Sequence, residues 1–170
     1  MGTAARVGVK AMETDRGALH PSGAVRANVE AVPVSEKMSV ILFSGTADRL
    51  QAAATIVSGA AAMDVETHVF LTFWGLNAFR REQTKVPPPM SPEYGELGRA
   101  VGEMMIAKGV PSWRQLIAGA KDLGTVYVHA CAMTMDLMGL AKEDLDPSVD
   151  DVIGVGTFIQ LSEGGRTIFI

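Results

Sequence analysis

A single cysteine is the residue of this chain with the clearest capacity for chemistry. Cys131 is the only cysteine among 170 residues, and it lies in the segment from His129 to Asp136 at the end of an apolar run. Thr125 to Val128 has the β-branched and aromatic content of a strand, and Thr134 to Leu140 is predicted to form a helix. We therefore expect the thiol in a strand-to-helix turn, where unpaired backbone N–H groups favour a reactive thiolate.

The neighbours of the cysteine leave its role open. A free cysteine often serves as a small buried apolar side chain, and a carboxylate such as that of Asp136 disfavours a nearby thiolate. His129 lies two residues before the cysteine, where a structural role is more common than a catalytic one. A reactive thiol and a purely structural thiol both remain alternatives.

The composition is that of one ordinary globular domain. Hydrophobic residues make up 48% and the formal net charge is −4, without a clustered basic face, so nucleic-acid binding is disfavoured. One cysteine and three scattered histidines offer no disulfide and no metal-ligand spacing, so no metal or other cofactor is expected. Neither a membrane-spanning apolar run nor an apolar signal segment is found. We expect a cytoplasmic protein, since a lone thiol stays reduced there.

The order of apolar segments predicts an α/β fold. Residues 1–37 carry few large apolar side chains, so we expect a flexible N-terminal extension before a domain over residues 38–170. Met38 to Phe43 is an apolar run of strand length. Helical spacing of apolar residues from Leu50 to Ala61 and a second strand from Val65 to Phe73 follow it. This order is a βαβ unit and predicts a parallel sheet.

The second half of the chain continues this alternation after one irregular insertion. The proline-rich segment 85–93 is predicted to be an exposed loop. Two helices are expected next, one ending at Gly109 and one running from Ser112 to Gly124. Beyond the cysteine turn, Val152 to Leu161 is predicted to be a helix and Thr167 to Ile170 a final strand.

Three turns that follow predicted strands are expected to share one pocket, because ligands of open α/β sheets bind beyond the carboxyl ends of strands. These are residues 44–48, 72–77 and 129–134. The first turn matches neither common phosphate-loop pattern, so a connecting turn capped by Thr46 or Asp48 is its simpler interpretation. The candidate binding residues of the three turns are Gly45, Trp74, Asn77, His129 and Thr134.

Two motifs in this order resemble those of the DsrE/DsrF-like sulfur-relay family, particularly its single-domain branch often labelled peroxiredoxin-like. They are TFWGLN, from Thr72 to Asn77, and ACAMTMDLMG, from Ala130 to Gly139. The resemblance covers residues 38–170. It implies a three-layer α/β/α sandwich with a mostly parallel sheet of about five strands, and assembly into homo-oligomers.

The same resemblance implies sulfur chemistry at Cys131. The thiol would carry sulfur as a persulfide or a thiosulfonate, between a rhodanese-like donor and a small SirA-like (TusA-like) carrier protein. One alternative is a peroxide-reducing enzyme, although its sulfenic acid would need a second thiol that this chain lacks. The other is a non-enzymatic binding module in which Cys131 only packs. A homo-oligomer is also predicted from the methionine-rich helix and the aromatic pair Trp74 and Phe79, which offer more apolar surface than one thin domain covers.

Overall fold

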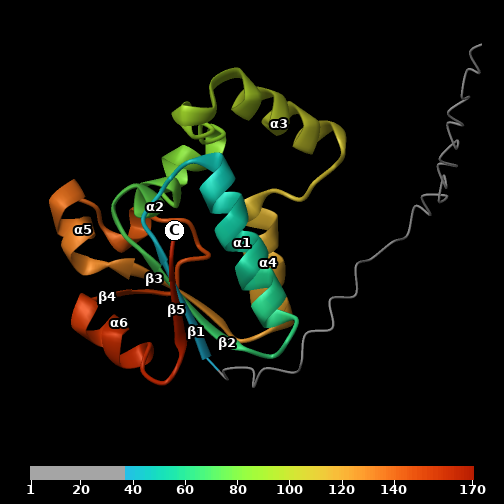
Figure 1. Ribbon diagram of the computed structural model, residues 1–170. Helices are drawn as coiled ribbons and strands as arrows, with labels where there is room; N and C mark the ends of the chain where they lie inside the picture. Colours follow the sequence, from blue (N-terminus) through green and yellow to red (C-terminus); the bar gives the residue numbers. More distant parts are fainter. Residues whose placement is uncertain (1–36) are drawn as a thin grey trace, which may run out of the picture. The chain divides into compact units, whose positions relative to one another are not determined.

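A five-stranded parallel sheet organises residues 37–170, which are the residues that the computed structural model describes (Figure 1). The extension predicted for residues 1–37 therefore lies outside the described residues, except for Lys37. The strands lie in the order β4-β3-β2-β1-β5, and every neighbouring pair is parallel. Their bounds are β1 (Lys37–Leu42), β2 (Glu66–Leu71), β3 (Val126–Cys131), β4 (Asp151–Ile153) and β5 (Arg166–Phe169).

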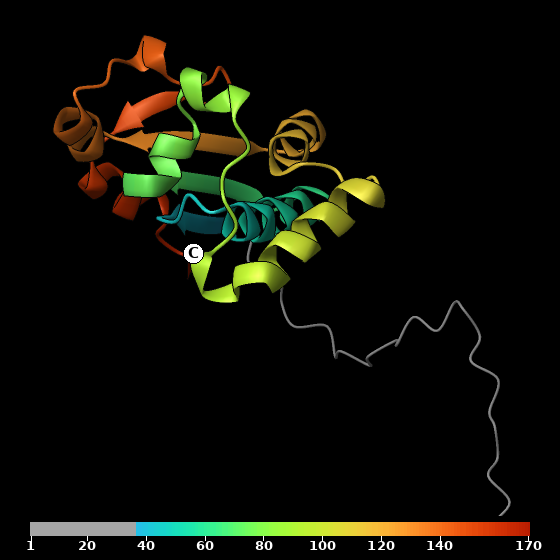
Figure 2. The same cartoon turned by 90° about the horizontal axis from the view of Figure 1, so that it is seen from above.

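Helices cover both faces of this sheet. Helices α1 and α4 lie against one face and α5 and α6 against the other (Figure 2), which confirms the predicted three-layer α/β/α sandwich. The helices are α1 (Ala47–Ala61), α2 (Phe73–Ala78), α3 (Gly95–Ala107), α4 (Trp113–Leu123), α5 (Ala132–Met138) and α6 (Val155–Leu161), with 3-10 turns η1 (Arg81–Lys85), η2 (Pro92–Tyr94) and η3 (Lys142–Asp144). None of the helices within residues 37–170 has both the length and the apolar character needed to cross a membrane.

The sheet face under α1 and α4 holds the main hydrophobic core. Val40, Val69 and Val128 are adjacent in the strand register and are all fully buried. The buried alanines of α1 let this helix pack closely on the sheet. Helix α4 starts where it was expected, because the Ser112 hydroxyl accepts a hydrogen bond from the backbone N–H of Gln115 in a capping box.

Alternate residues of the same strands point to the α5 and α6 face. Phe70 of β2, Cys131 of β3 and Phe158 of α6 form a small second apolar cluster there. Helices α5 and α6 have only seven residues each, so this layer is thin. Several large apolar side chains of its elements remain exposed, namely Tyr127, Met133, Leu137, Val155, Ile159 and Phe169.

The segment predicted as one helix from Val152 to Leu161 is instead two elements, and that prediction was wrong. Strand β4 ends at Ile153 and α6 begins at Val155. The strand is held by pairing with the end of β3 over three residues. So short an edge strand leaves no periodic pattern in the sequence.

Two other boundaries differ from the prediction. The residues after Leu71, expected to form a turn, fold into α2, and Phe73 at its first position has a positive φ of 45°. Residues 86–91 have no helix or strand, as predicted for the proline-rich segment. Pro92, however, begins the 3-10 turn η2, since proline suits the first position of a helical turn.

Candidate functional site

Cys131 is the last residue of β3 and the N-cap residue of α5. Its side chain is buried, with 3% of its surface exposed, and it makes no side-chain cap hydrogen bond. It packs in the cluster with Phe70 and Phe158, whose rings are stacked with centroids 4.5 Å apart. The strand-to-helix position agrees with the sequence prediction, and the aromatic cover over the thiol is a feature that the sequence did not indicate.

Thr134 is fully buried and joins the cysteine turn to the turn after β2. Its hydroxyl oxygen lies 3.1 Å from the Thr72 hydroxyl and accepts a 3.3 Å hydrogen bond from the backbone N–H of Phe73. Phe73 has the positive φ that is strained for a residue with a side chain. Thr134 thus holds this strained position in place and links the ends of β2 and β3.

His129 belongs to a chain of hydrogen bonds across the α5 and α6 face. His68 Nδ1 lies 3.0 Å from His129 Nε2, and both rings are almost completely buried. The outer ring nitrogens meet carboxylates at the two ends of the chain. His68 Nε2 is 2.8 Å from Glu66 Oε1, and His129 Nδ1 is 2.5 Å from Asp151 Oδ1. Both nitrogens of His129 are therefore occupied within the described structure.

This chain of contacts joins three strands of the sheet. Glu66 and His68 belong to β2, His129 to β3 and Asp151 to β4. Tyr127 stacks on His68 with ring centroids 5.2 Å apart and partly covers the pair.

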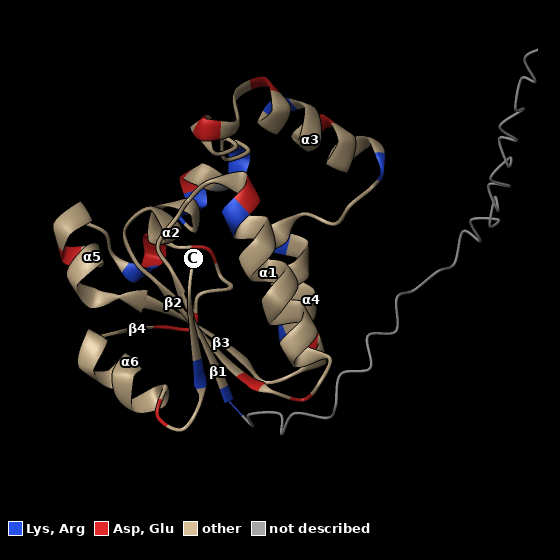
Figure 3. Cartoon of the chain, viewed as in Figure 1, with Lys and Arg blue, Asp and Glu red and all other residues tan. Residues whose placement is uncertain are grey.

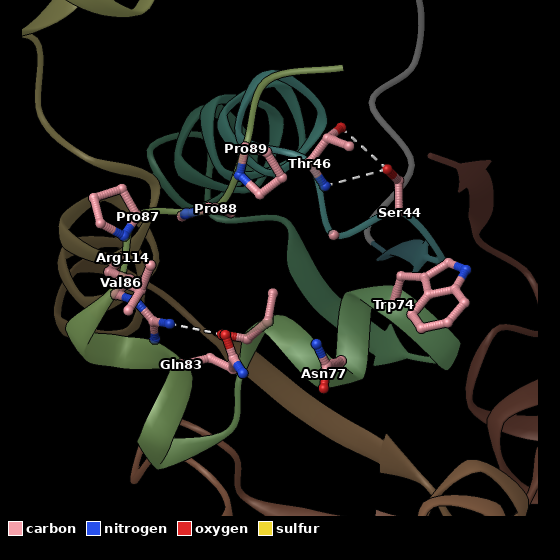
Figure 4. Close-up of a pocket in the computed structure, with 12 residues that line it drawn as sticks. Ser44, Thr46, Trp74, Asn77, Gln83, Val86, Pro87, Pro88, Pro89 and Arg114 are labelled. Atoms are coloured by element: carbon pink, nitrogen blue, oxygen red, sulfur yellow. Dashed lines mark hydrogen bonds between the residues drawn. The ribbon is translucent and has the colours of Figure 1, made fainter. Parts of the chain in front are cut away.

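A cavity of about 320 Å³ lies beyond the carboxyl ends of β1 and β2. Figure 4 shows Asn77 of α2 on one side and Arg114 of α4 on another, with the proline segment closing a third side. Gly45, Trp74 and Asn77 line it, as predicted for a shared pocket. The remaining lining residues are Ser44, Thr46, Ala78, Gln83, Val86, Pro87, Pro88, Pro89 and Arg114.

Two glycines let the two turns approach closely enough to form this cavity. A Cβ atom at Gly45 would lie 2.4 Å from the carbonyl oxygen of Trp74, and one at Gly75 would lie 2.1 Å from that of Leu42. Both neighbours are backbone atoms that cannot move aside. Side chains at these positions would force β1 and α2 apart, so Gly45 has a spacing role whether or not it contacts a ligand.

The proline segment is tied to the start of α1 by Asp48. Its carboxylate accepts hydrogen bonds of 2.9 Å from the backbone N–H and 2.7 Å from the hydroxyl of Ser91. Burial alone raises the pKa of Asp48, but the hydrogen bonds from Ser91 and Thr46 outweigh it and hold the pKa below its ordinary value. Asp48 therefore anchors this wall of the cavity from the first turn of α1. Thr46 is the N-cap residue of α1 but makes no side-chain cap hydrogen bond, so the predicted side-chain capping by Thr46 or Asp48 was wrong.

Arg114 gives the cavity a fixed cation. Its guanidinium donates a 2.6 Å hydrogen bond to the Ala78 carbonyl oxygen and a 3.2 Å hydrogen bond to Asp146, and it stacks over Trp113. Burial lowers its pKa more than Asp146 raises it. The group still remains charged at neutral pH, because an arginine is not deprotonated in proteins.

The prediction that all three turns share one pocket was wrong for the third turn. None of residues 129–134 lines this cavity. The physical reason is the alternation along β3, which turns Tyr127, His129 and Cys131 to the α5 and α6 face. The cavity instead reaches Arg114 of α4, a helix of the other layer.

Several residues of these sites were not predicted. Arg114 and Gln83 in the cavity and Phe158 over the thiol follow no motif. The pairing of His68 with His129 could have been predicted from the alternation of side chains along the two strands. His68 lies two residues before Phe70 in β2, and His129 lies two residues before Cys131 in β3. Because side chains alternate along a strand, all four point to the same face of the sheet.

Comparison with known proteins identifies the family. The chain belongs to the DsrE/DsrF/DrsH-like family, whose model matches residues 34–94 and 90–169. It is similar to the uncharacterized protein YrkE of Bacillus subtilis (strain 168), with 33% identity over 158 residues that cover 80% of this chain and 98% of YrkE. Membership suggests a role in sulfur relay in general terms.

Two solved structures resemble the fold. The ychN protein of E. coli covers 79% of this chain and 99% of its own, with a TM-score of 0.50 and 13% identity. A protein of unknown function from Methanobacterium thermoautotrophicum, MTH1491, covers 79% of this chain and 98% of its own, with a TM-score of 0.49 and 20% identity. At such identity the likeness to ychN bears on the fold alone.

Proposed function

We propose that this protein carries sulfane sulfur on Cys131 and passes it to the thiol of a carrier protein. The observation that carries the proposal is the position of the chain's single cysteine, which ends the inner strand β3 and begins α5 in a DsrE-like fold. Open α/β sheets bind ligands at this edge. A rhodanese-like protein is the proposed donor, a SirA-like (TusA-like) protein the proposed acceptor, and the reducing cytoplasm the proposed location.

The transfer balances without an external oxidant. The Cys131 thiolate attacks the outer sulfur of a donor persulfide, the donor sulfur–sulfur bond breaks, and the donor thiolate leaves with that bond's electron pair. The acceptor thiolate then attacks the outer sulfur of the Cys131 persulfide and regenerates the Cys131 thiolate. For a thiosulfonate load, the Cys131 thiolate attacks the terminal sulfonate sulfur of a donor S-thiosulfonate. The donor sulfur–sulfur bond breaks, its electron pair leaves with the donor thiolate, and Cys131 then carries an –SO3− group.

The cover over the thiol makes access a testable step. Phe158 is the only buried residue of α6 and stacks on Phe70 beside Cys131. We propose that movement of this ring exposes the thiol for attack. Phe158→Ala should therefore raise the rate at which iodoacetamide alkylates Cys131, whereas Ile159→Ala, an exposed neighbour on the same helix, should leave that rate unchanged. Equal rates in both variants would mean that the thiol is reached by another route.

Intact-protein mass spectrometry tests the chemistry itself. After exposure to polysulfide, the protein should gain one or more sulfur atoms on Cys131 and lose them when a SirA-like carrier is added. Cys131→Ser should keep the fold but show neither gain nor transfer, because a hydroxyl is not appreciably ionised at neutral pH. Catalytic reduction of peroxide with an added thiol, and no loading by any sulfane donor, would replace this proposal with the peroxidase alternative.

The burial of Cys131 favours a second candidate, a binding module in which the thiol only packs. With 3% of its surface exposed, Cys131 is placed like an apolar core residue. Under this candidate, Cys131→Ala would lower stability through the small cavity it creates and would change no sulfur loading, because none would occur. The mass spectra described above therefore separate the two candidates.

We also propose that copies of this chain associate. The α5 and α6 layer exposes apolar side chains, including Tyr127, Val155 and Phe169. Helix α6 bears no Asp, Glu, Lys or Arg, and α5 bears only Asp136 (Figure 3). An apolar surface of this kind is typical of a protein interface. Light scattering at low micromolar concentration should report more than one chain, and a monomer mass would contradict the proposal.

A further inference from the structure

A second hollow shares part of the proline segment with the cavity already described. It is a groove of about 410 Å³ between α3, α4 and residues 86–90, and we refer to it as the α3 groove. Val86, Pro87, Pro88 and Arg114 line both hollows. The additional lining residues of the α3 groove are Ala47, Gln51, Lys85, Met90, Gly102, Met105, Ile106, Val110, Ser112 and Trp113.

The α3 groove is apolar because α3 stands away from the sandwich (Figure 1). Gly98 is the only buried residue among the thirteen of α3, so most of its apolar side chains lack cover. Met105 from α3 and Trp113 from α4 face the groove from different helices. Its volume falls in the range of about 300–1,000 Å³ that small-molecule sites occupy, and such sites are mostly apolar with a few polar groups.

The charge around the groove has one sign. Of the described residues that line it, the charged ones are the cations Lys85 and Arg114. Arg114 is already bonded to Asp146 and to the Ala78 carbonyl oxygen. The side chain of Lys85 is exposed and makes no hydrogen bond or ion pair with residues 37–170. The groove therefore offers an apolar floor with one available ammonium group at its rim.

We propose that the α3 groove binds a small amphipathic acid, with its apolar chain between α3 and α4 and its anionic head at Lys85. This site is separate from Cys131 and does not depend on the sulfur chemistry proposed above. An exposed amphipathic helix gains stability when its apolar side chains are packed against another group. Ligand binding should therefore also stabilise α3. The distinguishing features of the ligand are its apolar chain and its negative head.

Tryptophan fluorescence gives a direct test with the full chain. The protein contains two tryptophans, so Trp74→Phe leaves Trp113 in the groove as the sole reporter. Decanoate, below its micelle concentration, should change Trp113 emission in a saturable way. The neutral analogue 1-decanol should bind about fivefold more weakly, and decylamine more weakly still, because a partly exposed ion pair contributes up to about that factor. Equal binding of all three, or no saturable change with decanoate, would overturn the proposal.

Three variants locate the binding. Lys85→Gln should weaken decanoate about fivefold and leave 1-decanol unchanged. Gly102→Leu should abolish decanoate binding, because a Cβ at Gly102 meets only Met90 atoms at 3.8 and 3.9 Å and the added side chain fills the groove. Its control is Gly119→Leu on α4, where a Cβ meets nothing within 4 Å. Undiminished binding by Gly102→Leu would overturn the proposal.

Two further outcomes separate this site from the other proposals. Cys131→Ser should bind decanoate as the unsubstituted chain does, so failure of sulfur loading and failure of ligand binding are distinguishable. If Gly102→Leu instead lowers the oligomer mass by light scattering and decanoate does not bind, the groove is an interface between copies and the ligand proposal is wrong.

Discussion

The two faces of the sheet are built differently although the same strands supply both. The α1 and α4 face is covered by helices of fifteen and eleven residues over fully buried valines. The α5 and α6 face is covered by two helices of seven residues each. It carries a thiol, two histidines and several exposed apolar side chains. The comparison indicates that one face supplies most of the stability, which leaves the other able to hold groups that would be costly in a uniform core.

The largest expected effect comes from truncating a side chain on the α1 and α4 face, which we call the well-covered face. Leu71 at the end of β2 is fully buried in the main core. Leu71→Ala should lower the free energy of unfolding by about 3 kcal/mol, from lost burial and the cavity left behind. Urea denaturation measures this change.

The matched variant on the other face is Ile159→Ala, at a side chain that is 64% exposed. Measured on the dissociated chain, it should change the free energy of unfolding by less than about 0.5 kcal/mol. A loss in the dissociated chain similar to that of Leu71→Ala would contradict the comparison between the two faces.

An intermediate effect is expected from the histidine pair. His129→Leu leaves His68 Nδ1 buried without its partner, which should cost about 1–3 kcal/mol. His68→Leu should cost a similar amount for the same reason. The double variant has no orphaned ring between the strands, so its loss in urea denaturation should be smaller than the sum of the two single losses. Strict additivity would mean that the two rings are not coupled.

The sequence predicted the well-covered face more completely than the other. The apolar runs of β1 and β2 and the capping pattern at Ser112 are local signals, and local signals specified those elements. Strand β4 was missed because three residues, Asp151 to Ile153, are held by their partner strand and not by their own propensity. Short elements defined by tertiary pairing are the weak point of such predictions.

The candidate site was predicted in its parts and not in its grouping. Gly45, Trp74 and Asn77 do share a cavity, and Cys131 does lie in a strand-to-helix turn. The prediction of one shared pocket considered only that each residue follows the end of a strand. It did not consider which face of the sheet each side chain points to. Side chains alternate between the two faces, so a shift of one residue moves a side chain to the opposite face. Arg114 was missed because it reaches the cavity from a helix with no motif of its own.

The smallest effect expected from removing an interaction lies at the edge of the well-covered face and depends on pH. Asp48 has a pKa below its ordinary value, because hydrogen bonds from Ser91 and Thr46 outweigh burial. A lowered pKa means that the ionised carboxylate stabilises the folded state. This stabilisation is fully present above the unfolded-state pKa of about 3.9 and is lost as the pH falls through the lower folded-state pKa. Asp48→Asn should therefore cost below about 1 kcal/mol at pH 7, since the group is partly exposed and screened.

The decisive measurement for Asp48 is the difference in free energy of unfolding between the unsubstituted chain and Asp48→Asn from pH 7 to pH 2.5. This difference should be constant down to about pH 4.5 and shrink below it. Glu103→Gln is the control, because within residues 37–170 Glu103 forms an ion pair only with exposed Arg99 on α3. Its difference in free energy of unfolding should depend much less on pH. A difference for Asp48→Asn that stays constant at low pH would mean that the loss comes from altered packing of the proline segment. The carboxylate would then not be what holds Ser91 and the cavity wall.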